Sequence, residues 1–193
     1  HGPYENYQTP EQRVPEKQLP YPWESCITLG SNWGYVPNEK LKPAGKVIHQ
    51  LIEVVAKAGS LLLGVGPTPQ GTLPEPVVQR LDDIGKWLKV NGAAIYNTRP
   101  TTHYKDNNIY FTQSKDSSVV YALALLPENS TVPATIEWSG HAPAKGGTIK
   151  LLATGKNLKF ITKGEKVTVT IPSSLQKSLG SAPALAFSIA KHR

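Results

Sequence analysis

The order of hydrophobic patterns along this chain constrains its fold more than any other feature. A short apolar run at residues 23–29 precedes a loop and then residues 44–58, where apolar side chains recur at helical spacing. The same order repeats at once, with an apolar run at residues 60–66, a loop and a helical pattern from about Glu75 to Val90. Both short runs are typical of buried strands. Two successive strand–loop–helix units predict parallel strands with right-handed crossovers, in an α/β sheet or barrel.

After Tyr96 the hydrophobic period changes from helical to alternating. In the clearest case, Val167, Val169 and Ile171 alternate with threonines, as in a strand with one buried face. Strands are predicted at residues 109–114, 118–126, 134–139, 148–153, 166–171 and 184–190. Short strands separated by turn residues are typical of an antiparallel β-sandwich.

Composition excludes several classes of function. The net charge of +7 could favour nucleic acid, but the lysines between residues 145 and 166 are spread over a region that alternates like strands, which is typical of a solvated sheet face. No apolar run approaches the roughly 20 residues of a membrane-spanning helix. We therefore expect neither a nucleic-acid nor a membrane partner. The single cysteine, Cys26, lies in an apolar context that predicts a small buried side chain, and no pair of histidines has the spacing of metal ligands.

Carboxylates and aromatic side chains gather near the start of the chain. Residues 1–22 show neither helical nor strand period and are predicted to form a long loop. The side chains concerned are Glu5, Glu11, Glu16 and Glu24, with Tyr4, Tyr7, Tyr21, Trp23, Trp33 and Tyr35. A sugar site needs this combination, because rings pack against the C–H faces of a pyranose while an acid protonates the departing glycosidic oxygen. Core packing in a loop-rich region explains the aromatic residues equally well.

Ordered motifs extend this pattern over residues 4–98: YxTPE, PWESC, SNWGY, LIEVVAKAGSLLLGVGPTPQGTLPE and RLDDIGKWLKVNGAAIY. This string resembles the C-terminal half of the catalytic domain of family 29 α-L-fucosidases. The resemblance implies an α/β plus all-β fold. Residues 1–100 would be the C-terminal part of a TIM-like (β/α) barrel, and residues 101–193 would be the C-terminal antiparallel β-sandwich. The polar stretch at residues 97–107 would hold the boundary.

The same resemblance implies a function. The expected activity is that of a retaining exo-α-L-fucosidase, which removes terminal fucose from oligosaccharides or glycoconjugates without a metal or other cofactor. The expected partners are the fucosylated substrate and the upstream part of the same catalytic domain. A periplasmic, secreted or lysosomal location is expected from the family.

Particular residues match the family's site. Glu11, in Thr-Pro-Glu, matches the acid/base position of bacterial members, and Glu24 is the alternative acid/base or a substrate contact. Trp33 matches an aromatic residue of the fucose pocket, where a ring packs against the C6 methyl group. Trp23 and Tyr35 are predicted as further substrate contacts.

The nucleophilic aspartate and the pocket histidines of the family are expected upstream of residue 1. Asp82 and Asp83 lie in a predicted helix, and Asp106 and Asp116 lie in predicted turns. A retaining site needs two carboxyl groups about 5–5.5 Å apart, so we expect this chain to be inactive by itself. The sequence also departs from the usual family string GGNLLLNVGP, because Ser60 and Gly64 replace two asparagines.

Two other functions stay open at this point. The first is a non-catalytic carbohydrate-binding module in the β-sandwich from about residue 107, with Trp138 as a candidate contact. The second is a phosphate site in the string GVGPTPQGT, which matches neither GxGxxG nor the P-loop pattern.

Overall fold

The computed structural model describes residues 7–190, which form two compact units that divide between Trp87 and Leu88. The first strand of the second unit begins at Thr98, inside the polar stretch where the sequence suggests a boundary. The final turn of the preceding helix belongs with this second unit.

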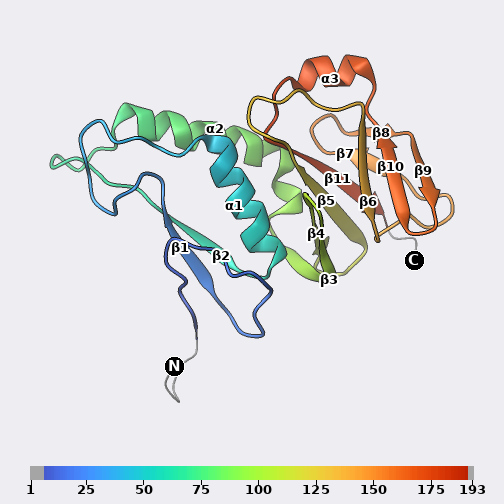
Figure 1. Cartoon of the computed structure of the whole chain (residues 1–193), viewed down its shortest axis with the longest axis horizontal. Coiled ribbons are helices and arrows are strands. Elements are labelled where there is room, and N and C mark those ends of the chain that lie inside the picture. Colours follow the sequence, from blue (N-terminus) through green and yellow to red (C-terminus); the bar gives the residue numbers. More distant parts are fainter. Residues whose placement is uncertain (1–6, 191–193) are drawn as a thin grey trace. The chain divides into compact units, whose positions relative to one another are not determined.

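Parallel strands and helices alternate in the first unit (Figure 1). Strand β1 (Glu24–Thr28) is followed by helix α1 (Ala44–Ala56), strand β2 (Ser60–Gly64) and helix α2 (Glu75–Asn91). β1 and β2 pair in parallel, with Cys26 opposite Leu62. The predicted order of elements and the parallel pairing are therefore confirmed for these two strands, whereas a closed eight-stranded barrel stays a prediction.

Strand β2 is less buried than its composition predicts. Leu62 is 44% exposed, and Leu61 and Leu63 are only half-buried. Neighbouring side chains on a strand point to opposite faces, so Leu62 shares a face with its partner Cys26, while Ile27 is buried on the other face. The prediction of a buried strand is wrong here, because one face of this small sheet remains open.

The segment before β1 is not a free loop. Gln8 and Trp23 form one isolated parallel bridge, and Glu11 and Cys26 form another. The backbone N–H of Gln12 donates to the carbonyl of Cys26 at 2.8 Å, and the N–H of Cys26 donates to the carbonyl of Pro10 at 3.1 Å. Residues 8–12 therefore extend the parallel sheet on the edge of β1 that β2 leaves free.

Two antiparallel sheets make up the second unit. One has the order β3-β4-β5-β11-β7-β8, and the other has the order β6-β10-β9. The bounds are β3 Thr98–Asp106, β4 Ile109–Ser114, β5 Val119–Leu125, β6 Thr135–Ser139, β7 Ile149–Leu151, β8 Lys156–Leu158, β9 Phe160–Lys163, β10 Lys166–Thr170 and β11 Ala184–Ala190. Helix α3 (Ser173–Leu179) precedes β11, and the 3₁₀ turn η1 (Gly92–Ala94) precedes β3.

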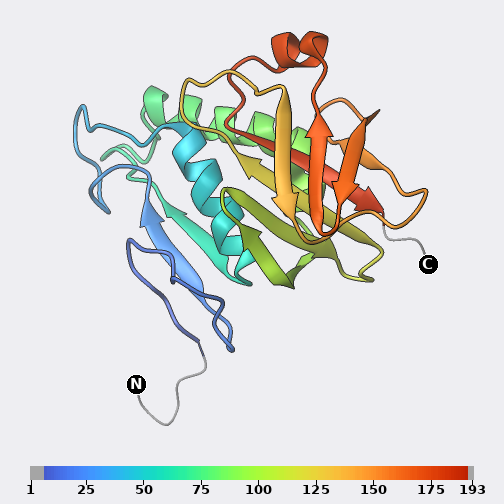
Figure 2. The ribbon, with the colours of Figure 1, turned by 45° about the vertical axis from the view of Figure 1, so that its right-hand side comes forward.

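The two sheets enclose one hydrophobic core (Figure 2). Phe111 on β4 and Phe187 on β11 flank Trp138 on β6, with ring centroids 6.5 and 5.8 Å from the indole. Val167 and Val169 are fully buried, whereas the threonines between and after them are not. The predicted β-sandwich and its alternating strands are confirmed.

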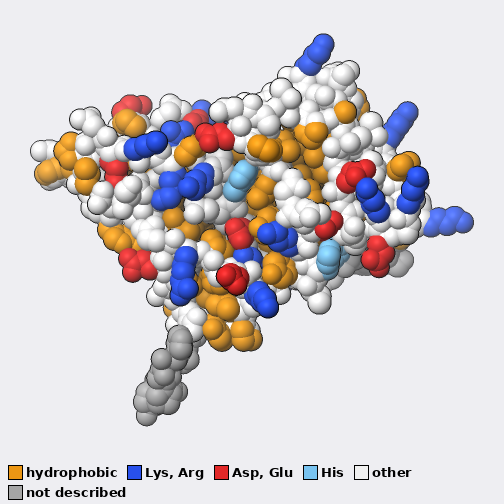
Figure 3. Space-filling view, in the orientation of Figure 1, with side chains coloured by type: hydrophobic (Ala, Val, Ile, Leu, Met, Phe, Trp, Pro, Cys, Tyr) orange, Lys and Arg blue, Asp and Glu red, His pale blue; other side chains and the backbone are white. Residues whose placement is uncertain are grey.

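Two properties of the described residues bear on the excluded functions. None of their helices combines the length and the hydropathy that crossing a membrane requires. On the face that Figure 3 shows, Lys and Arg side chains are interspersed with Asp and Glu.

Candidate functional site

Glu11 and Trp33, the predicted acid/base and the predicted sugar contact, touch each other. The indole Nε1 of Trp33 donates a hydrogen bond to Oε1 of Glu11 at 2.8 Å. Trp33 is 45% exposed, and Glu11 is also exposed. A carboxyl group and an accessible aromatic ring therefore lie side by side, as a sugar site requires.

Gln12 holds the backbone beside Glu11. Its φ of 53° lies in the left-handed region, which is uncommon for a residue other than glycine. Its side-chain amide donates to Oγ1 of Thr28 at 3.0 Å, and its Oε1 accepts from the backbone N–H of Thr28 at 3.3 Å. Ser25 Oγ donates to the carbonyl of Arg13 at 2.7 Å. Together with the Glu11–Cys26 bridge, these contacts fix Glu11 against β1.

Glycine backbone supports the ring of Trp33. A Cβ atom at position 64 would lie only 2.9 Å from Cζ3 of Trp33, so a side chain there would have to displace the ring. Nearby, a Cβ at position 66 would lie 2.6 Å from the carbonyl carbon of Gly34. The loops that follow β1 and β2 therefore meet backbone to backbone, and this close approach sets the place of Trp33.

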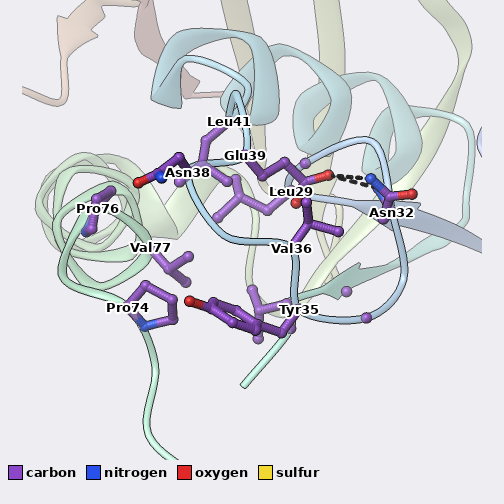
Figure 4. Close-up of a pocket in the computed structure, with 15 residues that line it drawn as sticks. Leu29, Asn32, Tyr35, Val36, Asn38, Glu39, Leu41, Pro74, Pro76 and Val77 are labelled. Carbon is purple, nitrogen blue, oxygen red and sulfur yellow. Dashed lines mark hydrogen bonds between the residues drawn. The ribbon is translucent and has the colours of Figure 1, made fainter. Parts of the chain in front are cut away.

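Glu39 closes the loop that carries Trp33. Its Oε1 accepts from the backbone N–H of Ser31 at 2.7 Å. It also accepts from the backbone N–H and from Nδ2 of Asn32, at 2.9 and 2.8 Å (Figure 4). These hydrogen bonds, first that of the Asn32 side chain and then that of the Ser31 backbone, hold the pKa of Glu39 below its usual value. Lys42 Nζ donates to the carbonyls of Thr28 and Gly30. One anion and one cation thus tie the two ends of the loop.

Glu24, the alternative acid/base, has different partners. It begins β1 and is half-buried. Its carboxylate accepts a hydrogen bond from Tyr7, and burial followed by this hydrogen bond raises the pKa of the Tyr7 phenol. Burial, then the charge of Glu24, then that of Glu11, raises the pKa of the Cys26 thiol. Both glutamates therefore act on the same half-buried cysteine, but each has its own hydrogen-bond partner.

Trp23, predicted as a substrate contact, lies in the core of the first unit. It is 2% exposed, and its indole N–H donates to the carbonyl of Lys57 at 3.2 Å. A ring buried on both faces cannot pack against a sugar, so Trp23 does not join Trp33 and we assign it a structural role.

Tyr35, the other predicted contact, lines a cavity of about 150 Å³. This cavity lies between the loop after β1, the end of β2 and the start of α2, and the Tyr35 ring lies beside Pro74 (Figure 4). Glu11 and Trp33 do not line it.

The aspartates occupy other places. Asp82 and Asp83 lie on α2, and Asp83 forms an ion pair with Lys86 at 3.4 Å. In the second unit, Asp106 accepts from the backbone N–H of Ser139 at 2.6 Å. Asp116 accepts from Ser114 and Ser118, and these hydrogen bonds lower its pKa to about 2.

Some candidates lie outside this site or outside the described part of the chain. Tyr4 and Glu5 fall among residues that the structure does not describe, and Glu16 is exposed in the loop. Between residues 7 and 190, no group of three or more His, Cys, Asp or Glu side chains could hold a metal ion.

Within the described residues, neither Trp138 nor the string GVGPTPQGT forms the binding site suggested for it. Trp138, the aromatic contact suggested for the sandwich, is 1% exposed and cannot reach a sugar. In the suspected phosphate loop, Thr68 N–H donates to the carbonyl of Thr72 at 2.8 Å, and Gly66 is covered by Gly34 and Tyr35. The loop is therefore folded upon itself and upon its neighbour.

Two supporting residues escaped sequence reasoning. Gln12 and Glu39 belong to no motif, and their partners lie 16 and up to 8 residues away along the chain. Only their position next to the TPE and SNWGY strings could have pointed to them.

Known proteins match both the sequence and the fold. A family model described as α-L-fucosidase matches residues 1–93. Human plasma α-L-fucosidase is 32% identical over 172 residues, which cover 84% of this chain and 35% of that protein. α-L-Fucosidase isoenzyme 1 from Paenibacillus thiaminolyticus superposes with a TM-score of 0.81 at 27% identity, over 97% of this chain and 45% of that one.

The α-fucosidase of Thermotoga maritima in complex with fucose superposes with a TM-score of 0.79 at 27% identity, over 98% of this chain and 43% of that one. The chain thus spans less than half the length of each of these relatives. Over the part that it matches, in sequence and in fold, the chain belongs to the α-L-fucosidase family.

Proposed function

We propose that this chain is the part of a retaining exo-α-L-fucosidase that supplies the acid/base and one wall of the fucose pocket. The single observation that carries the proposal is the contact between Glu11 and the exposed ring of Trp33. It supports this function because the chain belongs to the α-L-fucosidase family and its fold matches an enzyme solved with fucose. The substrate would be a terminal fucose on an oligosaccharide or glycoconjugate.

In this proposal the reaction has two steps, and Glu11 serves both. An aspartate from the upstream part of the catalytic domain attacks the anomeric carbon, while protonated Glu11 gives its proton to the departing glycosidic oxygen. Glu11, now a carboxylate, then takes a proton from water. The resulting hydroxide attacks the anomeric carbon, breaks the bond to aspartate and yields fucose with the original configuration.

Trp33 would contribute to substrate choice. The exposed part of its ring offers an apolar surface for the C6 methyl group of fucose. Burial of one such group stabilises the complex by about 0.8 kcal/mol, a modest preference for fucose over an unmethylated sugar.

Substitution of the two glutamates in the full-length parent enzyme tests the assignment. With an aryl α-L-fucoside, we expect Glu11→Gln to lower kcat by roughly 10²–10⁴-fold, as loss of a general acid does. Glu24→Gln should have a smaller effect, because Glu24 is bound to Tyr7. Glu16→Gln, an exposed glutamate of the same loop, is the matched control.

The anomer formed first, observed by NMR, tests retention. The α-anomer of fucose is expected. Full activity of Glu11→Gln would mean that a residue other than Glu11 is the acid/base. A β-anomer as the first product would rule out a retaining reaction.

A further inference from the structure

We propose that Trp33 is a positioning residue for Glu11, because its indole N–H fixes one oxygen of the Glu11 carboxyl group. Gly64, which has no side chain, leaves the space that the Trp33 ring occupies. The inference rests on the proposed role of Glu11 as acid/base. It goes beyond that role because it assigns Trp33 an action on the catalytic proton and not only on the sugar.

The hydrogen bond from Trp33 engages one particular oxygen of Glu11. The indole N–H is a donor only, and it approaches Oε1 of Glu11 at 2.8 Å. A proton carried by Glu11 therefore belongs on Oε2, because Oε1 already faces a donor. The indole thus selects which oxygen of Glu11 presents the proton to the glycosidic bond.

Glu11 is exposed, so neighbouring side chains do not enclose it. An exposed glutamate samples several rotamers, and a protonated one must lie within about 2.6–3.2 Å of the oxygen that it protonates. Backbone contacts of residues 8–12 fix the main chain, but they leave the torsions of the Glu11 side chain free. The hydrogen bond from Trp33 restricts those torsions.

The ring of Trp33, which carries the donor N–H, is itself held in place. One side of the Trp33 ring lies on Gly64, where a Cβ would come within 2.9 Å of Cζ3 and 3.0 Å of Cε3. The neighbouring contact of Gly66 with Gly34 and the hydrogen bonds of Glu39 fix the loop. The ring therefore rests on backbone and not on a mobile side chain, so it can hold Glu11 in one place.

Positioning of Glu11 and packing against the sugar require different parts of the Trp33 side chain. A platform needs only the ring, whereas a positioning residue needs the N–H. Trp33→Phe keeps an aromatic surface and removes the donor. Gly64→Ala keeps the donor but displaces the ring. Both variants should therefore lose the hydrogen bond that orients the Glu11 carboxyl group.

The first experiment uses this chain without any catalytic readout. The protein has four tryptophans, so a ¹H–¹⁵N spectrum should contain four indole signals, and Trp33→Phe identifies the one from Trp33. We expect that signal to move in Glu11→Gln, which removes the carboxylate that the indole N–H contacts, and to stay in place in the matched variant Glu16→Gln. Gly64→Ala should displace the same signal, whereas Gly85→Ala, where the added Cβ meets open space, should not.

Either of two results overturns the contact. In one, the Trp33 signal stays in place after Glu11→Gln; in the other, it moves equally after the control substitution Glu16→Gln. Both would mean that the indole does not bind this carboxylate.

The second experiment uses the full-length parent enzyme and two leaving groups. Departure of 2,4-dinitrophenolate needs little protonation, whereas departure of an alkoxide needs a general acid. We expect Trp33→Phe and Gly64→Ala to lower kcat/KM roughly tenfold for an alkyl fucoside, a part of the roughly 10²–10⁴-fold that a general acid contributes. For the dinitrophenyl fucoside the loss should stay within about threefold, because that reaction bypasses the acid.

The outcomes distinguish the two proposals. Equal losses on both substrates would mean that Trp33 serves only as a platform, which overturns the positioning role. If Glu11→Gln itself shows no dependence on the leaving group, the proposed acid/base assignment fails, while the spectrum still reports whether Trp33 binds Glu11.

Discussion

The two units of this protein bury their apolar side chains to different extents. In the sandwich, side chains from both sheets enclose one another, and Phe111, Phe187 and Leu151 are fully buried. In the parallel unit, Ile27 is buried on one face of the sheet, but Leu62 on the other face is 44% exposed. The sandwich thus completes a core from its own strands, and the parallel sheet does not.

This difference leaves one face of the parallel sheet uncovered. Cys26 and Leu62 lie opposite each other on the open side of the sheet, and both Glu11 and Glu24 act on the Cys26 thiol there. If the upstream part of the catalytic domain supplies further strands, as we propose, they would pair at the edges of the sheet and curve over this face.

Two matched leucine substitutions should separate the units most clearly. Leu151→Ala in β7 removes side-chain atoms from the closed core and should lower the free energy of unfolding by about 2–5 kcal/mol. Urea denaturation followed by near-ultraviolet circular dichroism measures the change. A loss below about 1 kcal/mol would mean that the sandwich core is not closed as described.

Leu62→Ala in β2 is the counterpart of that substitution. Because Leu62 already contacts solvent, its truncation in this chain should change the free energy of unfolding by less than about 1 kcal/mol. In the full-length parent the same change should have a larger effect, since the proposed upstream strands would bury Leu62. An equal effect in both proteins would contradict the proposed closure of this face.

A smaller effect is expected for Glu39→Gln, which tests the loop of the open unit. The pKa of Glu39 is lowered in the folded protein, so its contribution to stability is complete above the ordinary value of 4.5 and is lost as pH falls through the lowered value. The variant should therefore be slightly less stable than the wild type at neutral pH. Thermal unfolding at pH 7 and in progressively more acidic buffers should show the difference shrinking, and a difference independent of pH would exclude the charge of Glu39 as its cause.

Asp116→Asn, in an exposed turn of the sandwich, tests a hydrogen-bonded charge of the closed unit in the same way. Its pKa falls from 3.8 to about 2 in the folded state, mainly through the Ser114 hydroxyl. The stabilisation is therefore complete above pH 3.8 and disappears as pH approaches 2. Thermal unfolding between these limits should show the wild type and the variant converging, whereas a constant gap would indicate a role for the side chain other than its charge.

The sequence predicted central strands far better than edge strands. β4, β5, β7, β10 and β11 coincide closely with predicted segments because buried apolar side chains mark each of them, and the edge strand β6 was found for the same reason. The overlooked strands β3, β8 and β9 all lie at the edge of a sheet. Pro100 and a shifted register interrupt β3, and lysines mark β8 and β9. Edge strands tolerate proline and charge, so no clear period marks them in the sequence.

The aromatic residues near the start of the chain have similar sequence contexts, but they differ in exposure in the structure. Trp23 and Trp33 both lie in family motifs and both were expected at the sugar. Trp23 directly precedes β1 and is buried, whereas Trp33 follows β1 in a loop and is exposed. Residue type and spacing do not encode exposure in a loop-rich segment, because exposure depends on what packs against it.

The sequence by itself determined the order of elements, the change from parallel to antiparallel pairing, the family and the identity of Glu11 and Trp33 as candidates. These features depend on local periodicity and on motifs, which neighbouring residues encode. Only the tertiary structure brought Trp33 onto Gly64 and its N–H onto Glu11, across 31 and 22 positions of the chain. The reason is physical: a hydrogen bond and a close glycine contact depend on where two loops meet in space, and no local pattern records that meeting.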